Sequence, residues 1–239
     1  MSIVSHGQQA LILPLLEQLN RMSGPWVDKV VLTVNVPETR LVTGQQDGLP
    51  IEWIQNQGPK GFGANHNAAF ERCRTDWFLI LNPDIRFDAD VLRPLLAQAG
   101  TDTGVLTTRI VEPGKNLPEP HRAMLTPCEL WSRHRPGYRA PAHPAWIPGM
   151  FMLFSAAAYR QIGGFDTRFH MYCEDFDICA RLRLSGWQIQ VLEELRVLHE
   201  AQRASRRNWR HLGWHIASFL RLWRSDAFWR YRAMWARPS

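Results

Sequence analysis

An apolar run that ends abruptly in polar residues occupies positions 77–84, with the sequence WFLILNPD. Five consecutive apolar residues favour a strand buried on both faces, which is typical of parallel sheets. The strand ends at Asn82-Pro83, because proline lacks the N–H that a sheet ladder needs. Asp84 would then lie at the sheet edge where α/β proteins bind ligands. The stretch therefore predicts an α/β fold with a site at this edge, although Asn-Pro-Asp is equally good turn chemistry.

Apolar runs and helical segments alternate on both sides of this strand. We expect further strands at residues 2–5, 30–34, 51–54, 104–111, 150–154 and 187–192. We expect helices at residues 10–19, 64–73, 88–99, 155–161 and 174–184. This alternation predicts a mostly parallel sheet with helices on both faces. Residues 112–148 interrupt it with eight of the sixteen prolines, which indicates a long functional or disordered loop.

Composition excludes several classes of protein. The chain has 239 residues, of which 45% are hydrophobic, so disorder throughout is excluded. Its longest apolar stretch, around residues 146–159, is too short to span a bilayer, and no secretory signal pattern is visible. The four cysteines form no Cys-x-x-Cys pair, which argues against a zinc ribbon. Reduced thiols in the cytosol are therefore expected.

Positive charge is concentrated near the C-terminus. Residues 196–239 hold ten arginines against Glu200 and Asp226, a net +8, whereas the whole chain carries +6. The same segment holds five of the eleven tryptophans. Arginine mixed with tryptophan suits an anionic membrane surface. A nucleic-acid surface, or a terminal helix packed on the domain with solvated arginines, would give the same composition.

A helix over about residues 205–235 is expected to carry the membrane contact. Apolar residues recur there at three- and four-residue steps and predict one apolar stripe: Trp209, Leu212, Ile216, Phe219, Leu220 and Trp223. Four arginines are placed to flank this stripe: Arg206, Arg210, Arg221 and Arg224. The protein would then lie at the inner face of the cytoplasmic membrane.

Residues 56–67, with the sequence NQGPKGFGANHN, form a glycine-rich stretch before a helix. Glycine lets the backbone approach a ligand, and a helix start offers free N–H groups to phosphate or ribose oxygens. The spacing matches neither a Walker loop nor the dinucleotide fingerprint. The stretch therefore predicts either a ligand loop or a plain helix cap.

Two further stretches carry candidate catalytic side chains. Residues 163–166 (GGFD) are followed by 172–177 (YCEDFD), where three acidic residues lie within four positions. Acidic residues are favoured at a helix start, and adjacent carboxylates in a cleft also suit a general base. His199 follows an apolar strand, where it could ligate a metal or serve only the structure.

Taken in order, these stretches resemble family 2 inverting glycosyltransferases of the GT-A fold. The similarity is greatest to the bacterial rhamnosyltransferases that build O-antigen and related surface polysaccharides. It covers nearly the whole chain and is carried by residues 61–67, 81–84, 163–166 and 174–181, with 211–221 similar to tails in that branch.

The resemblance implies a domain organisation. A GT-A catalytic domain would span residues 1–200, with a nucleotide-binding half at about 1–111 and an acceptor half at about 112–200. A helical extension, basic and aromatic, would follow at residues 201–239.

The resemblance also implies roles for individual residues. The nucleotide sugar would contact Ser5, His6, Asn35, Gly61, Phe62, Asn65, Asn82 and Asp84. Asp84 and His199 would hold a divalent cation, Mn²⁺ or Mg²⁺. Asn82 stands where the family has the first aspartate of its metal motif, so weak metal binding is expected. Asp175 matches the general base, with Glu174 as the alternative.

The implied reaction moves a sugar, such as rhamnose, from a dTDP- or UDP-linked donor to a glycan or lipid-linked glycan, with inversion. A nucleotidyltransferase would share the α/β core, but Ser5-His6-Gly7-Gln8 lacks the basic glycine-rich signature it needs. A non-catalytic protein that binds membrane or nucleic acid through its arginines is the other alternative. The resemblance favours the transferase, without a nucleic-acid partner.

Overall fold

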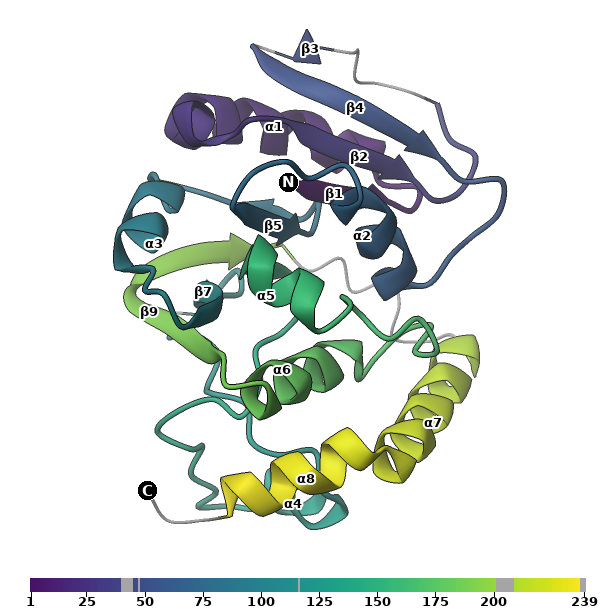
Figure 1. The fold of residues 1–239 in the computed structure, drawn as a ribbon, viewed down its shortest axis with the longest axis vertical. Coiled ribbons are helices and arrows are strands. Elements are labelled where there is room, and N and C mark those ends of the chain that lie inside the picture. Colours follow the sequence, from purple (N-terminus) through teal and green to yellow (C-terminus); the bar gives the residue numbers. More distant parts are fainter. Residues whose placement is uncertain (40–44, 47, 116, 201–208, 237–239) are drawn as a thin grey trace.

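A nine-stranded sheet forms the centre of the molecule, and helices cover both of its faces (Figure 1). The computed structural model describes residues 1–39, 45–46, 48–115, 117–200 and 209–236. The strands are β1 (Ser2–Ser5), β2 (Val30–Val34), β3 (Gln45–Gln46), β4 (Leu49–Gln55), β5 (Trp77–Leu81), β6 (Ile85–Arg86), β7 (Thr103–Val111), β8 (Phe151–Ser155) and β9 (Gln188–His199). The helices are α1 (Gln9–Ser23), the short 3-10 helix η1 (Gly24–Trp26), α2 (Phe62–Phe70), α3 (Leu92–Gln98), α4 (Pro127–Ser132), α5 (Ala156–Gln161), α6 (Glu174–Leu184), α7 (Trp209–Arg224) and α8 (Asp226–Trp235).

The strand order is β3-β4-β2-β1-β5-β8-β7-β9-β6. Strands β4, β2, β1 and β5 pair in parallel, and so do β7 and β9. β8 lies antiparallel to both β5 and β7, so these two neighbours point the same way. The sheet is therefore mostly parallel, as expected, and the carboxyl ends of β2, β1 and β5 meet at one edge.

Alternation along the strands divides the core between two faces. Leu79 and Leu81 pack on the face covered by α1, and Phe78 and Ile80 pack on the face covered by α2, α5, α6 and α8. Each face thus receives every second residue of β5, as the pleat requires. α1 meets its face through four buried residues at helical spacing: Ile12, Leu15, Leu16 and Leu19.

Several elements differ from their predicted bounds, and α3 and β9 show the physical reasons. The helix expected from residue 88 begins at Leu92, because the carboxylate of Asp90 accepts the backbone N–H groups of Leu92 and Arg93 at 3.0 and 3.3 Å. The strand expected at 187–192 continues to His199. Its acidic residue Glu193 interrupts the apolar run, yet it pairs with Arg109 of β7 at 3.1 Å, and the strand continues beside β7.

The proline-rich segment 112–148 is largely irregular in the part that the structure describes, with α4 as its helix. Thr126 begins α4, since its side chain accepts the N–H of Glu129 at 3.2 Å. The indole N–H of Trp146 donates to the Ala123 carbonyl at 2.8 Å and links the end of the segment to an earlier part of it.

The C-terminal helices complete the core on the side of the sheet that α6 covers. Leu222, Phe228 and Tyr231 are at most 1% exposed. Phe176 of α6 lies 5.7 and 5.9 Å from the Phe228 and Tyr231 rings, and the Tyr231 hydroxyl donates to the Ala145 carbonyl at 2.5 Å. α8 is therefore part of the packing around α6.

The apolar stripe predicted for the C-terminal helix is divided in the structure between the protein core and the solvent. Phe219 and Trp223 pack against the core, whereas Leu212, Ile216 and Leu220 are exposed by 50, 54 and 46%. Apolar spacing by itself does not indicate which residues of such a stripe meet the core and which meet the solvent. Arg206, with residues 201–208, and the side chains of Trp209 and Arg210 lie outside the described residues.

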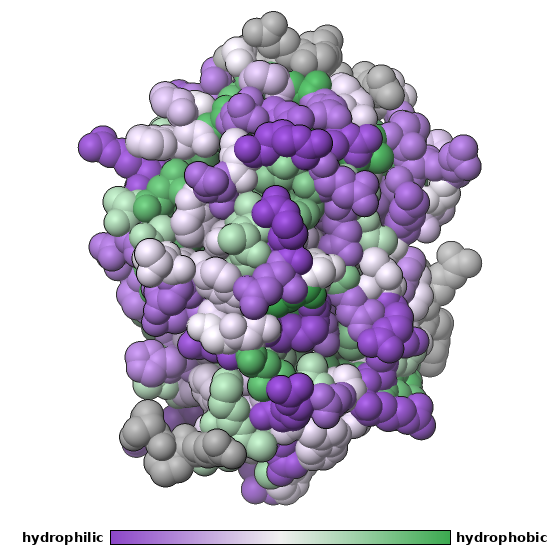
Figure 2. Space-filling model, viewed as in Figure 1, coloured by the Kyte–Doolittle hydropathy of each residue, from purple (hydrophilic) through white to green (hydrophobic). Residues whose placement is uncertain are grey.

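The surface view is mostly hydrophilic, with small hydrophobic patches on the face shown (Figure 2). Among the described residues, no helix combines the length and apolar character needed to cross a membrane.

Candidate active site

Three buried asparagine side chains hold the glycine-rich loop. The Asn56 amide donates to the side-chain oxygens of Asn35 at 2.8 Å and Asn65 at 2.7 Å. Asn35 exchanges hydrogen bonds with the Lys60 backbone, accepting its N–H at 2.8 Å and donating to its carbonyl at 3.0 Å. Asn65 donates to the Gly61 carbonyl at 3.1 Å. This network fixes the loop at the carboxyl end of β2.

Two glycines of this loop, Gly61 and Gly63, are required by packing within the protein. A Cβ at Gly61 would lie 2.6 Å from the His170 carbonyl oxygen, and one at Gly63 would lie 2.5 Å from Cβ of Phe165. The Phe62 N–H donates to the same His170 carbonyl at 3.0 Å. The close approach that glycine permits is therefore made to residues 165–170.

Ser5 and His6, at the end of β1, lie beside this loop. The Ser5 hydroxyl accepts the Gln8 N–H at 3.2 Å. His6 is exposed, and its Nδ1 lies 3.1 Å from the side-chain nitrogen of Asn35. Ser5, His6 and Asn35 thus come together at the carboxyl ends of two adjacent strands.

Asp84 and His199 form a buried pair at the same sheet edge. A carboxylate oxygen of Asp84 lies 3.2 Å from Nε2 of His199, because β6 pairs with the end of β9. Burial lowers the pKa of His199, but the hydrogen bond and charge of Asp84 outweigh this effect and hold it above its ordinary value. The other Asp84 oxygen and His199 Nδ1 have no hydrogen-bond partner among the described residues.

This pair offers two ligands for a cation. Within the described residues, no group of three or more histidine, cysteine, aspartate or glutamate side chains could hold a metal ion. An unpartnered carboxylate oxygen beside an imidazole still suits a hard divalent cation whose remaining ligands come from phosphate oxygens. The donor set fits a metal bound jointly by protein and substrate.

Arg86 places a fixed positive charge next to this pair. Its guanidinium contacts Glu200 at 3.0 Å and donates to the Pro83 and Ile85 carbonyls at 2.9 and 2.8 Å. These bonds brace the turn that carries Asp84.

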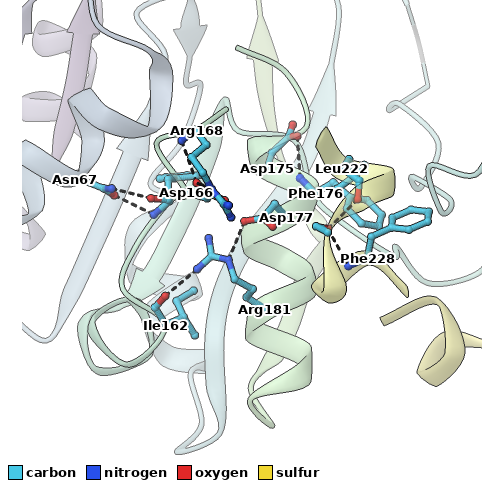
Figure 3. A network of polar contacts seen from close by, with 12 residues as sticks. Asn67, Ile162, Asp166, Arg168, Asp175, Phe176, Asp177, Arg181, Leu222 and Phe228 are labelled. Carbon is cyan, nitrogen blue, oxygen red and sulfur yellow. Dashed lines mark hydrogen bonds and ion pairs between the residues drawn. The ribbon is translucent and has the colours of Figure 1, made fainter. Parts of the chain in front are cut away.

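Some carboxylates of residues 166–177 form ion pairs with arginines, and others do not (Figure 3). Asp166 pairs with Arg168 at 2.6 Å, and Asp177 pairs with Arg181 at 2.8 Å. Neither Glu174 nor Asp175 forms an ion pair with any described residue. Paired carboxylates are poor bases because the cation favours their ionised form. The geometry leaves Glu174 and Asp175 as candidates.

Protonation distinguishes these two neighbours. Burial raises the pKa of Asp175 to about 6, and burial together with the charge of Asp175 raises the pKa of Glu174 to about 8. Glu174 is 5% exposed, whereas Asp175 is partly exposed. Near neutral pH Asp175 is therefore ionised and accessible, and Glu174 is protonated.

Residues 149–150 connect the start of α6, which carries Glu174 and Asp175, to the turn that carries Asp84. The Asn82 N–H donates to the Met150 carbonyl at 2.9 Å, and the Gly149 backbone hydrogen-bonds to the Asp175 carboxylate. A Cβ at Gly149 would lie 3.0 Å from the Phe62 ring. Gly149 therefore brings Asn82, Asp175 and Phe62 into one region.

A cavity of about 920 Å³ is lined by residues of the proline-rich segment 112–148. Its walls combine aromatic and charged groups, among them Arg122, Glu129, Arg133, His134, Tyr138 and Trp146. The charge of Arg122, which lines the cavity, also acts on the Asp175 carboxyl.

A glycosyltransferase family model, described as "Glycosyltransferase like family 2", matches residues 2–213. The chain belongs to glycosyltransferase family 2. It is 27% identical to rhamnosyltransferase WbbL of Escherichia coli (strain K12), over 92% of this chain and 90% of that one. It is 29% identical to the N-acetylglucosaminyl-diphospho-decaprenol L-rhamnosyltransferase of Mycobacterium tuberculosis, over 89% of this chain and 85% of that one. The family and the rhamnosyltransferase resemblance are thereby confirmed.

Solved glycosyltransferase structures share the fold. Staphylococcus aureus TarS 1-349 in complex with UDP superposes with a TM-score of 0.66 at 14% identity, over 94% of this chain and 66% of that one. GalNAc-T7 with UDP, GalNAc and Mn²⁺ gives 0.66 at 14% identity, over 84% of this chain and 43% of that one. These neighbours confirm the GT-A fold, and one of them was crystallised with Mn²⁺.

The structure gathers the residues singled out from sequence into adjoining groups. Ser5, His6, Asn35, Gly61 and Asn65 surround the glycine-rich loop, and Asn82, Asp84 and His199 lie at the end of β5. Sequence reasoning missed Asn56 and Gly149. Asn56 begins the quoted glycine-rich stretch, but nothing local distinguishes an amide that bridges two others from ordinary turn chemistry.

Proposed function

We propose that this glycosyltransferase moves rhamnose, or a closely related hexose, from a dTDP- or UDP-linked donor to a lipid-linked glycan diphosphate, with inversion. The observation that carries the proposal is the ionised, unpaired carboxylate of Asp175, joined through Gly149 and Met150 to the strand end that bears Asp84. The names of the E. coli and M. tuberculosis relatives support rhamnose as the sugar, and the second supports a lipid diphosphate acceptor.

Asp175 acts as the general base in this proposal. It accepts the proton of the acceptor hydroxyl while that oxygen attacks the anomeric carbon, and the bond from this carbon to the nucleoside diphosphate breaks. A single displacement inverts the anomeric centre without a protein nucleophile. Glu174, which stays protonated near neutral pH, keeps a second negative charge away from the base.

Asp84 and His199 would hold a divalent cation, Mn²⁺ or Mg²⁺, together with the donor diphosphate. When bound, such an ion supplies positive charge that stabilises the leaving group. Arg86 adds a second positive charge at the same edge. Because only two protein ligands are available, we expect modest affinity for the ion alone.

The cavity lined by Arg122 and Trp146 is a suitable acceptor site. Its aromatic side chains can pack on sugar rings, and its charged groups can hydrogen-bond hydroxyls. An acceptor bound there would present its hydroxyl to the base.

The exposed face of α7 would rest on an anionic membrane at the cytoplasmic side. Leu212, Ile216 and Leu220 lie one helical turn apart, and the exposed Arg221 and Arg224 can meet anionic head groups. A lipid-linked acceptor gives a functional reason for this contact.

A donor panel tests the proposed function. The protein is incubated with dTDP- and UDP-linked sugars and a diphospholipid-linked N-acetylglucosamine acceptor, with Mn²⁺ or Mg²⁺. We expect product with dTDP-rhamnose or a related donor, and inverted anomeric configuration by NMR. Retention of configuration, or transfer of a nucleotidyl group, would contradict the proposal.

A further inference from the structure

The backbone just before the catalytic carboxylates has an unfavourable conformation. Tyr172 and Cys173 have φ angles of 73° and 66°, in the left-handed region that side chains with a Cβ rarely adopt. Cys173 begins α6, and Glu174 and Asp175 follow directly. Such a conformation persists only where surrounding contacts enforce it.

Tyr172 is held by two histidines of α7. Its hydroxyl lies 2.7 Å from Nδ1 of His211, and its ring stacks on His215 with centroids 3.4 Å apart and planes at 11°. His211 and His215 are four residues apart and therefore share one helix face. This face of α7 therefore holds the side chain of Tyr172 by a hydrogen bond and a ring stack.

The same face contacts the two preceding residues. The Ser218 hydroxyl donates to the Met171 carbonyl at 2.8 Å and is buried. The Trp214 ring lies 4.9 Å from the ring of His170. Together with the histidines, these residues follow the i, i+3, i+4, i+7 pattern of one helix face.

On its other side, the segment of residues 170–172 packs against the glycine-rich loop. The His170 carbonyl accepts the Phe62 N–H at 3.0 Å and leaves no room for a Cβ at Gly61. Residues 170–172 thus lie between α7 and the glycine-rich loop, directly before the base.

We propose that the inner face of α7, namely His211, Trp214, His215 and Ser218, is a clamp that positions the catalytic carboxylates, with Tyr172 as the positioning residue through which it acts. This inference rests on the proposed role of Asp175 as the base. The clamp holds the left-handed turn, the turn sets the first residues of α6, and the Asp175 carboxylate therefore points toward the acceptor. The C-terminal extension thereby takes part in catalysis without touching substrate.

Substitutions at His215, with a control elsewhere, test the clamp. His215→Ala removes the stacked ring, His215→Phe keeps a flat ring in its place, and His143→Ala is a matched control at an exposed histidine elsewhere. Hydrogen exchange of the amides of residues 172–177 is measured without substrate, and kcat and donor KM are measured with substrate.

We expect His215→Ala to raise exchange at residues 172–177 by about tenfold or more, since local opening becomes easier. Its kcat should fall by about tenfold, with donor KM changed less than about twofold, because only the base is displaced. His215→Phe should restore hydrogen exchange and kcat to nearly native values. His143→Ala should match the native chain in both measurements. Tyr172→Phe, which loses only the bond to His211, should give a smaller change in the same direction.

Native exchange and native kcat in His215→Ala would overturn the proposal. Faster exchange with an unchanged kcat would also overturn it, because the turn would then not position the base. The exchange measurement needs no activity, so it tests the clamp even if the donor panel finds no transfer and the proposed function fails.

Discussion

A carboxylate oxygen of Asp84 lies 3.2 Å from Nε2 of His199, because the short strand β6 pairs with the end of β9. We expect Asp84→Asn to lower kcat/KM by about 100-fold or more, since the charged ligand of the proposed cation is lost. Donor turnover across a Mn²⁺ titration checks this. Asp88→Asn, the same change at an exposed position, is the control. Full activity of the native chain in excess chelator would contradict the role of a metal.

Asp175→Asn should lower kcat by about 100-fold or more while donor affinity stays within about twofold, because the amide cannot accept the hydroxyl proton. Single-turnover kinetics and donor binding by calorimetry separate the two effects. Asp166→Asn makes the same change in a carboxylate that is paired with Arg168. Near-normal turnover of Asp175→Asn would transfer the base assignment to Glu174.

The pH profile should report the ionisation of the base. Burial raises the pKa of Asp175 to about 6, and the base works only when ionised. We therefore expect kcat/KM to rise with pH along a limb centred near 6. Glu174→Gln should keep that limb in place, because Glu174 is already neutral there. A limb near pH 4 would show that Asp175 is not desolvated as the structure indicates.

Glu174 should make the fold less stable as the pH rises. Its pKa is raised to about 8 by burial and the charge of Asp175, so the folded chain binds this proton more tightly than the unfolded chain. The stabilising contribution is full below about pH 4.5 and is lost as pH approaches 8. Thermal unfolding should show Glu174→Gln gaining stability over the native chain at pH 8.5 compared with pH 4.5. An equal difference at both pH values would contradict the raised pKa.

The outer face of α7 should bind anionic vesicles. Replacement of Leu212, Ile216 and Leu220 by serine should abolish co-sedimentation with phosphatidylglycerol-containing liposomes, and salt should weaken the binding of the native chain. Trp26→Ala removes an exposed apolar residue elsewhere and should have no effect. Equal sedimentation of the native chain and the triple variant would discard this membrane contact.

The parallel strands of the core could be predicted from sequence, because each is recognisable from its own residues. β2 and β5 are uninterrupted apolar runs, and their observed bounds are the predicted ones. β9 was predicted too short, because Glu193 is stabilised by Arg109 from a distant part of the chain. Periodicity describes a segment alone, and it cannot include a partner far away in sequence.

The candidate site follows the same division. Asp84, His199 and Asp175 could be named from their motifs, which the structure places at the sheet edge and at the start of α6. The contacts that distinguish Asp175 from Asp177 could not be predicted from sequence, because they depend on the ion pair of Asp177 with Arg181 and on the burial of Asp175. The sequence also could not indicate which residues of α7 pack on the core, since the same apolar spacing fits a helix that meets the core or the solvent.

The packing of α8 against α6 has a consequence for the order in which the protein matures on the ribosome. The helix that bears Asp175 is synthesised well before Phe228 and Tyr231, the residues that enclose Phe176. A nascent chain that has not reached Tyr231 leaves that part of α6 uncovered. The start of α6 therefore acquires its final packing late in translation, and a product that ends before Phe228 leaves the apolar surface around Phe176 exposed.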